Sequence, residues 1–147
     1  MKYRGWRTAA PLLGGLLADH LGRQVLPARP KGWVLVTVPL HRRRLRSRGY
    51  NQSSLLARDV GKTLALPARD GLLERSNDSS PQVEVRTQEQ RRENVAGSFD
   101  ASAEVEGLSV IFVDDVATTG STLSAYAAAL KDAGALDVRG LVLARES

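Results

Sequence analysis

The sequence predicts an α/β fold in which a mostly parallel sheet is flanked by helices. Two observations lead to this class. Short apolar stretches of strand length alternate along the chain with longer stretches that have helical spacing. In addition, two of the predicted strands end at unusual polar segments, and ligands of parallel sheets bind at such strand ends. With 147 residues, we expect a single domain covering residues 1–147.

The first half of the chain predicts two helices around one strand. Residues 7–26 carry leucines at helical spacing and are followed by a proline-containing linker. Residues 33–38 predict a buried strand, and residues 39–50 a loop dense in arginine. Residues 51–66 have leucines and a valine on one helical face, and a short strand is expected near residues 72–73.

The second half predicts a strand, a long helix and a final strand. Residues 88–94 favour a short polar helix, and the strand at 108–113 leads directly into two acids. The helix expected from Leu123 to about residue 133 has its inner face at Leu123, Tyr126, Ala127 and Leu130. Gly134 would close it as a C-terminal cap, and residues 138–144 then form the last strand.

The composition excludes several classes of protein. The chain has no cysteine, which excludes disulfides and thiolate metal sites. No apolar run approaches the roughly 20 residues that a membrane helix needs, and the first residues lack the apolar core of a signal peptide. We therefore expect a cytoplasmic protein without a membrane span.

Charge is distributed unevenly between the two halves of the chain. Residues 1–75 hold 15 Lys and Arg against 4 Asp and Glu, a net charge of +11. Residues 76–147 hold 6 Lys and Arg against 12 Asp and Glu, a net charge of −6. A basic half indicates an anionic partner such as a polyphosphate or a nucleic acid. The alternative is a solvated basic surface, because arginine is common on protein surfaces.

The most informative stretch is VIFVDDVATTGST at residues 110–122. A buried strand that feeds a glycine-containing turn at a helix start is typical of phosphate binding, because unpaired backbone N–H groups carry partial positive charge there. Gly120 would let the main chain approach the phosphate and take a positive φ. Asp114 and Asp115 suit ribose hydroxyls or the waters of a metal ion. The alternative is an acidic strand end before an ordinary helix with Ser121 as its N-cap.

A second anion site is predicted where the first strand ends. Five arginines lie within residues 42–48, directly after the predicted strand and Pro39. Arginine forms charge-assisted contacts with phosphate groups. The two strand ends, one at Pro39 and one at Asp114, are expected to form the two halves of one site.

Residues 110–122 resemble the phosphoribosyl-pyrophosphate (PRPP) loop of type I phosphoribosyltransferases. That signature is four apolar residues, two acids, an apolar residue, any residue, Thr, any residue, Gly, a small residue and Thr, and the chain fits it at every position. The resemblance implies a type I phosphoribosyltransferase-like fold with a flexible hood loop, which the chain would carry at about residues 76–99. Arg91 and Arg92 in the hood either reach the pyrophosphate or lie exposed on a surface helix.

Across nearly its whole length, the chain resembles the ComF family of phosphoribosyltransferase-like proteins, some of which are linked to natural DNA uptake. The matching segments are residues 1–5, VPLHRRRLRSRGYNQ at 38–52, SSPQ at 79–82, QRREN with GSF at 90–99, and the PRPP loop. Many family members begin with a cysteine-bearing zinc ribbon ahead of the first segment. This chain begins at that segment without cysteine, either as a short variant or because the start is missing, so zinc binding is not carried over.

The resemblance implies a role for each site residue. Asp114 and Asp115 are the catalytic acids, which hold the ribose hydroxyls and favour positive charge on the ring as pyrophosphate leaves. Mg²⁺ would be bound with PRPP, largely through the ligand and water rather than by direct protein ligands. The remaining PRPP-binding residues are those of the phosphate loop, Ala117, Thr118, Thr119, Gly120, Ser121 and Thr122, and those of the pyrophosphate loop, Leu40, His41 and Arg42. His41 is equally well explained as a polar residue with a local partner.

Two functions are compatible with these residues. The first is an enzyme that transfers 5-phosphoribose from PRPP to an acceptor and acts in natural competence. The second is a non-catalytic module that senses PRPP while Arg43, Arg44, Arg46 and Arg48 bind single-stranded DNA. If the chain binds DNA, aromatic residues of the basic half such as Trp33 and Tyr50 would stack on the bases. If it is an enzyme, these residues would pack in the core. Competence or recombination proteins and a second copy of the chain are further possible partners.

Overall fold

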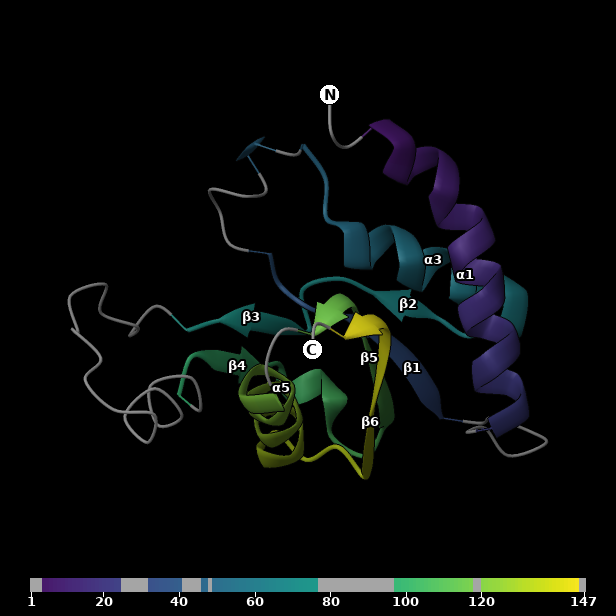
Figure 1. The fold of residues 1–147 in the computed structure, drawn as a ribbon. Coiled ribbons are helices and arrows are strands. Elements are labelled where there is room, and N and C mark those ends of the chain that lie inside the picture. The colour runs from purple at the N-terminus through teal and green to yellow at the C-terminus, as the bar shows by residue number, and fades with distance from the viewer. Residues whose placement is uncertain are drawn as a thin grey trace.

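The computed structural model contains a four-stranded parallel sheet with helices on both faces and a separate two-stranded antiparallel sheet (Figure 1). The structure describes residues 4–24, 32–40, 46–47, 49–76, 97–117 and 120–145. The predicted α/β class is confirmed. The elements are α1 (Arg4–Gln24), β1 (Trp33–Thr37), α3 (Gln52–Leu64), β2 (Ala68–Arg69), β3 (Leu73–Arg75), β4 (Phe99–Ala101), η1 (Ala103–Val105), β5 (Ser109–Ala117), α5 (Gly120–Asp132) and β6 (Asp137–Arg145).

The strands of the main sheet follow the order β2-β1-β5-β6, which places the two most apolar strands in the middle. All five residues of β1 are buried, as expected for a strand that is covered on both faces. β1 and β5 run in register from Trp33 opposite Ser109 to Thr37 opposite Val113. Their carboxyl ends therefore lie side by side at the same edge of the sheet.

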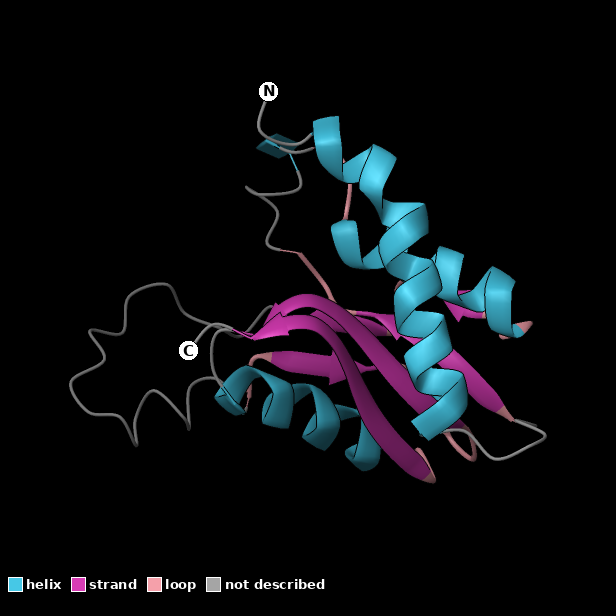
Figure 2. Cartoon of the chain, turned by 45° about the vertical axis from the view of Figure 1, so that its right-hand side comes forward, coloured by secondary structure: helices cyan, strands magenta, loops and turns pink. Residues whose placement is uncertain are grey.

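The sheet separates two apolar cores (Figure 2). Because side chains alternate along a strand, Ile111 and Val113 of β5 enter the core beneath α1 and α3, whereas Val110 and Phe112 enter the core beneath α5. β3 and β4 belong to the α5 side, where Leu73 and Phe99 are buried. The predicted inner face of α5 is confirmed, since Tyr126 and Leu130 are buried and Leu123 and Ala127 pack against them.

Helices α1 and α3 approach each other closely at a glycine. A Cβ atom added at Gly14 of α1 would lie 2.5 Å from the Cβ of Asp59 on α3. The neighbouring Gly15 has nothing within 4 Å of the corresponding position. The close packing of the two helices therefore requires a glycine at position 14 but not at position 15.

The starts of two helices differ from the sequence-based expectation. α1 begins at Arg4 rather than residue 7, and α5 begins at Gly120 rather than Leu123. The short strands β2 and β4 were not predicted. The polar helix expected at 88–94 and most of the predicted hood lie outside the described residues. In the part of the chain that is described, no helix is long and apolar enough to cross a membrane.

Candidate functional site

The connections of the sheet reverse between β1 and β5, which makes the space outside the carboxyl ends of these two strands the expected ligand crevice. β1 continues through α3 to β2 on one side, whereas β5 continues through α5 to β6 on the other, and α3 and α5 cover opposite faces (Figure 2). In open α/β sheets, ligands bind outside the carboxyl ends of the strands at the point where the connections reverse. The two strand ends that carry unusual polar sequences are the ones that meet there, as the sequence predicted.

Asp114 and Asp115 lie inside β5 rather than just beyond its end, which corrects the sequence-based strand boundary at residue 113. The strand continues to Ala117 because β6 remains paired with it, with Asp114 opposite Val142 and Ala117 opposite Arg145. β1, in contrast, ends at Thr37, opposite Val113. The acids therefore stand one and two residues beyond the last residue pair of β1 and β5, at the mouth of the crevice.

The two acids belong to opposite faces of the sheet. By strand alternation, Asp114 follows Phe112 onto the α5 side, and Asp115 follows Val113 onto the side of α1 and α3. Asp114 is 8% exposed and has partners of its own, whereas Asp115 is half-buried. The acids are thus not a symmetric pair, and we expect them to contact different parts of a ligand.

The charges of these two acids contribute to a raised pKa of Tyr126 in α5. Burial raises the pKa of its phenol to about 12, the charge of Asp114 adds to this increase more than that of Asp115, and Arg75 opposes it. Tyr126 is buried between two aromatic neighbours, Phe99 and Phe112. The α5 side of the sheet edge therefore carries the carboxylate of Asp114 near a cluster of three aromatic rings.

The first turn of α5 begins three residues after β5 ends. Gly120, Ser121 and Thr122 form the start of the helix, so their sequence-based assignment to a loop is corrected. Gly120 does not have the expected positive φ, and a Cβ there would meet nothing within 4 Å. Helical geometry accounts for the first observation, and the exposure of Gly120 accounts for the second. Because α5 follows β5 along the chain, its N-terminus, whose first N–H groups lack helical partners, lies near the carboxyl end of β5, where a phosphate can be bound.

The other side of the crevice is formed where the chain leaves β1. Pro39 and Leu40 follow the strand and are half-buried, and Arg46 is exposed. Leu40 is thus brought to the same edge of the sheet as Asp114, Asp115, Ala117, Gly120, Ser121 and Thr122. The remaining predicted site residues, Thr118, Thr119, His41, Arg42, Arg43, Arg44 and Arg48, lie outside the described part of the chain.

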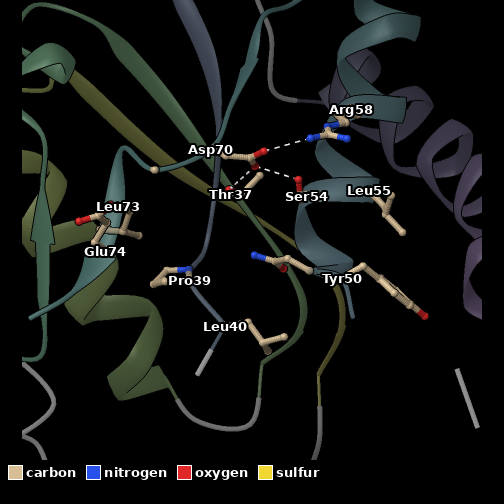
Figure 3. A pocket seen from close by; sticks show the side chains of 12 residues that line it. Thr37, Pro39, Leu40, Tyr50, Ser54, Leu55, Arg58, Asp70, Leu73 and Glu74 are labelled. Atoms are coloured by element: carbon tan, nitrogen blue, oxygen red, sulfur yellow. Dashed lines mark hydrogen bonds and ion pairs between the residues drawn. The ribbon is translucent and has the colours of Figure 1, made fainter. Parts of the chain in front are cut away.

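A pocket of about 440 Å³ opens on the β2 side of β1 (Figure 3). Its described lining comes from the end of β1, the start of α3 and the turn between β2 and β3, and includes Pro39, Leu40, Ser54, Asp70 and Leu73. No residue of β5 or α5 is part of that lining.

Asp70 organises the polar end of the pocket (Figure 3). Its carboxylate accepts hydrogen bonds from the hydroxyls of Thr37 and Ser54, both at 2.8 Å, and from the Arg58 guanidinium at 3.2 Å. Burial alone would raise the pKa of Asp70, but the hydrogen bonds from Ser54, Thr37 and Arg58, together with the charge of Arg58, lower it overall. Asp70 therefore ties β1, α3 and the chain after β2 together as a carboxylate.

Sequence reasoning did not identify this network. Asp70 follows a two-residue strand and belongs to no motif, so its partners are visible only once β1, β2 and α3 are placed. Asn51 was expected at the start of a helix. It does cap α3, but its additional hydrogen bond to the Val38 carbonyl joins residues 13 apart and has no local sequence signal. The residues that bracket the arginine-rich segment were therefore missed as site residues.

Comparison with known proteins agrees with the observed fold. Residues 50–147 match the phosphoribosyl transferase domain family. In a structural comparison, the chain is similar to the glutamine PRPP amidotransferase of B. subtilis, with a TM-score of 0.61 and 23% identity over 93% of this chain and 26% of the other. It is also similar to a hypoxanthine phosphoribosyltransferase of Trypanosoma cruzi, with a TM-score of 0.52 and 16% identity over 96% and 76% of the two chains. At these identities the likeness concerns the fold, and it confirms the type I phosphoribosyltransferase fold.

Sequence relatives confirm the resemblance to the ComF family. The DNA utilization protein YhgH of Salmonella typhi is 33% identical over 90% of this chain and 60% of its own length. Competence protein F of Haemophilus influenzae is 32% identical over 76% and 50% of the two chains. Competence protein ComFC of Bacillus subtilis is 35% identical over 71% of this chain and 40% of its own length. The chain thus spans 60% or less of the length of these relatives. Taken with the fold and the matched residues, these findings show that the chain belongs to the phosphoribosyl transferase domain family.

Proposed function

We propose that this domain binds PRPP together with Mg²⁺ in the crevice between β1 and β5. The observation that carries the proposal is the meeting of three features at one edge of the sheet: the acids of β5, the first turn of α5 and the end of β1. The N-terminus of α5 suits the 5-phosphate, and the chain after Pro39 suits the pyrophosphate. The ribose then lies over Asp114 and Asp115, between the two anion sites.

The residues of this chain have distinct tasks in such a site. Backbone N–H groups of residues 120–122, with the Thr122 hydroxyl, orient the 5-phosphate without any cationic side chain. Asp114 and Asp115 accept hydrogen bonds from ribose hydroxyls and place negative charge near C1 of the sugar. That charge favours the positive ring which develops when the bond from C1 to pyrophosphate breaks. Pyrophosphate leaves toward Leu40, His41 and Arg42.

Magnesium fits the chemistry of this site. Mg²⁺ prefers oxygen ligands and retains several waters, which suits carboxylates beside a polyphosphate. In the described part of the chain, no cluster of three Asp, Glu, His or Cys side chains is placed to hold a metal ion. We propose that oxygens of PRPP and water are the main ligands of Mg²⁺, because this ion dehydrates reluctantly and usually binds through substrate phosphates. When bound, Mg²⁺ would neutralise the charge of the leaving pyrophosphate.

Transfer of the phosphoribosyl group to an acceptor extends the proposal. We further propose a cytoplasmic role connected with DNA uptake, and the names of the relatives, which refer to DNA utilization and competence, support the connection with DNA. A thermal-shift experiment tests the binding step: 1 mM PRPP with Mg²⁺ should raise Tm, whereas PRPP with EDTA should raise it less. A ligand present at about 100 times its Kd stabilises a protein by ~2.7 kcal/mol, which is easily detected. An unchanged Tm with PRPP and Mg²⁺ would count against the proposed function.

The charge of the first half supports a second candidate function, binding of single-stranded DNA. Residues 1–75 carry a net charge of +11, and five of their arginines lie within residues 42–48. We propose that Arg43, Arg44, Arg46 and Arg48 contact the DNA backbone. Competence or recombination proteins and a second copy of the chain remain candidate partners in this role.

Fluorescence anisotropy with a labelled single strand tests the DNA proposal. Changing Arg43, Arg44 and Arg46 to Glu should weaken binding and reduce the dependence of log K on log salt concentration by about 2, since three phosphate contacts are lost. The matched control changes Arg23, Lys62 and Lys131, which are exposed elsewhere, to Glu. Equal effects of the two triple variants would indicate net charge alone and would contradict a specific basic segment.

A further inference from the structure

The arginine-rich segment 39–50 is bracketed by two residues that are hydrogen-bonded to each other. The side-chain amide of Asn51, which follows the segment, donates to the backbone carbonyl of Val38, which precedes it, at 2.9 Å. The same side chain also accepts a hydrogen bond from the N–H of Ser53 at 3.0 Å and so caps α3. Asn51 therefore holds both ends of the segment. It caps α3, where the segment ends, and it binds the Val38 carbonyl, where the segment begins.

The residue before Val38 is held by a second contact. The hydroxyl of Thr37 donates to Asp70 at 2.8 Å, and Asp70 is held in turn by Ser54 and Arg58 of α3 (Figure 3). Thr37 is 4% exposed and pairs in register with Val113, one residue before the acids. The Val38 carbonyl is thus tied to the N-cap of α3, and the Thr37 side chain is tied to α3 through Asp70.

We infer that Asn51 and Asp70 are positioning residues for the pyrophosphate half of the site. The inference rests on the proposed PRPP function. Both residues line the pocket on the β2 side of β1, whereas the strand that carries the acids, β5, lies on the other side of β1. They act through residues 37–40, whose course sets where the pyrophosphate loop begins. Holding that chain in one conformation before the ligand arrives lowers the ordering cost of binding.

A positioning role differs measurably from a general contribution to stability. PRPP carries both a 5-phosphate and a pyrophosphate, whereas ribose 5-phosphate lacks the pyrophosphate. Loss of the contacts at Val38 and Thr37 should weaken PRPP binding and leave binding of ribose 5-phosphate unchanged. A variant that only loosens the fold weakens both ligands in the same proportion.

Two variants remove these contacts one at a time without changing charge. Asn51→Ser retains a good N-cap hydroxyl but is too short to reach the Val38 carbonyl. Asn51→Asp is unsuitable because its added charge would itself repel an anion. Thr37→Val keeps the shape of the side chain and removes the donor to Asp70. The matched control is Thr63→Val, which removes a hydroxyl that donates to the Asp59 carbonyl on the exposed side of α3.

The experiment is titration of PRPP with Mg²⁺, and separately of ribose 5-phosphate, into the wild type and these three variants. We expect Asn51→Ser and Thr37→Val each to weaken PRPP binding by about 10- to 100-fold, with ribose 5-phosphate within about twofold of wild type. Thr63→Val should leave both affinities unchanged. Inorganic pyrophosphate, titrated as a probe of the same half-site, should lose affinity in parallel with PRPP.

Each alternative outcome has a separate meaning. Wild-type protein that binds no PRPP contradicts the proposed function, and with it the positioning role. Wild-type protein that binds PRPP while both variants match Thr63→Val overturns the positioning role alone. An equal loss for PRPP and ribose 5-phosphate also overturns it, since that result indicates a general effect on the fold. Because the two variants break different hydrogen bonds, the test holds even if one of them folds poorly.

Discussion

The ring of Phe99 in β4 packs edge-on against the ring of Tyr126 in α5, with centroids 4.6 Å apart. Tyr126 also contacts Phe112 of β5, at 5.6 Å between centroids. The cluster therefore joins the small β3–β4 sheet, which brackets the predicted hood, to the helix after the phosphate loop and to the strand that carries the acids. Its position makes Tyr126 a central packing residue of the α5 side.

Truncation of Tyr126 should strongly destabilise the protein. We expect Tyr126→Ala to lower the free energy of unfolding by about 3–5 kcal/mol, as other large aromatic truncations in cores do. Tyr126→Phe keeps the ring contacts and should cost much less. Urea denaturation of the three proteins measures the difference, and similar midpoints for Tyr126→Ala and wild type would contradict the assigned packing.

Tyr126 should also make stability depend on high pH. Its pKa is raised from 10.0 to about 12 in the folded protein, so folding favours the neutral phenol. The resulting stabilisation is complete below pH 10 and is lost as pH rises from 10 toward 12. Wild-type protein should therefore lose stability relative to Tyr126→Phe over this range. Denaturation curves at several pH values would contradict the assignment if the two proteins stayed parallel.

Asp70 should make the stability of the protein fall at low pH, whereas Tyr126 makes it fall at high pH. Its pKa is lowered below the ordinary value of 3.8 in the folded protein, because donors from Thr37, Ser54 and Arg58 outweigh the effect of burial. The stabilisation is present above pH 3.8 and is lost as pH falls through the lowered pKa. Asp70→Asn should accordingly reduce the dependence of stability on pH in the acid range. If acid unfolding of wild type and variant showed the same pH dependence, the hydrogen-bond network would not exist in solution.

The adjacent glycines of α1 provide a matched pair of substitutions. Gly14→Ala places a methyl group 2.5 Å from the Cβ of Asp59, so the helices must separate and stability should fall. Gly15→Ala meets nothing within 4 Å and should stabilise the protein by ~0.5–1 kcal/mol through helix propensity. Thermal denaturation of both variants tests the contact between α1 and α3. Equal shifts in Tm would show that the two helices do not pack as described.

The parts of the fold that sequence predicted are those with strong local patterns. β1 is a run of five apolar or β-branched residues before a proline, and α5 has an apolar face that ends at Gly134, where φ is positive. The strand, acids and helix start around residues 110–122 were likewise recognisable from order and spacing. A strand that feeds a helix N-terminus is encoded locally, because each step depends on neighbouring residues.

Features that depend on tertiary pairing were not predictable in the same way. β2 is two residues long, and its pairing of Ala68 with Leu35 of β1 defines it more than its composition does. The strand β5 extends past the acids because β6 lies beside it as far as Arg145. The ties of Asn51 to Val38 and of Asp70 to Thr37 join residues 13 and 33 apart. No pattern in a single segment of the sequence contains that information.

Isothermal titration of PRPP with Mg²⁺ into the wild type and into the Asp114→Asn, Asp115→Asn double variant tests the central claim most directly, with ribose 5-phosphate as the control ligand. We predict micromolar binding of PRPP to the wild type, a free energy of about −8 kcal/mol, and much weaker binding of ribose 5-phosphate. The double variant should lose PRPP binding while remaining folded. Absence of PRPP binding to the wild type, or unchanged binding to the double variant, would contradict the account.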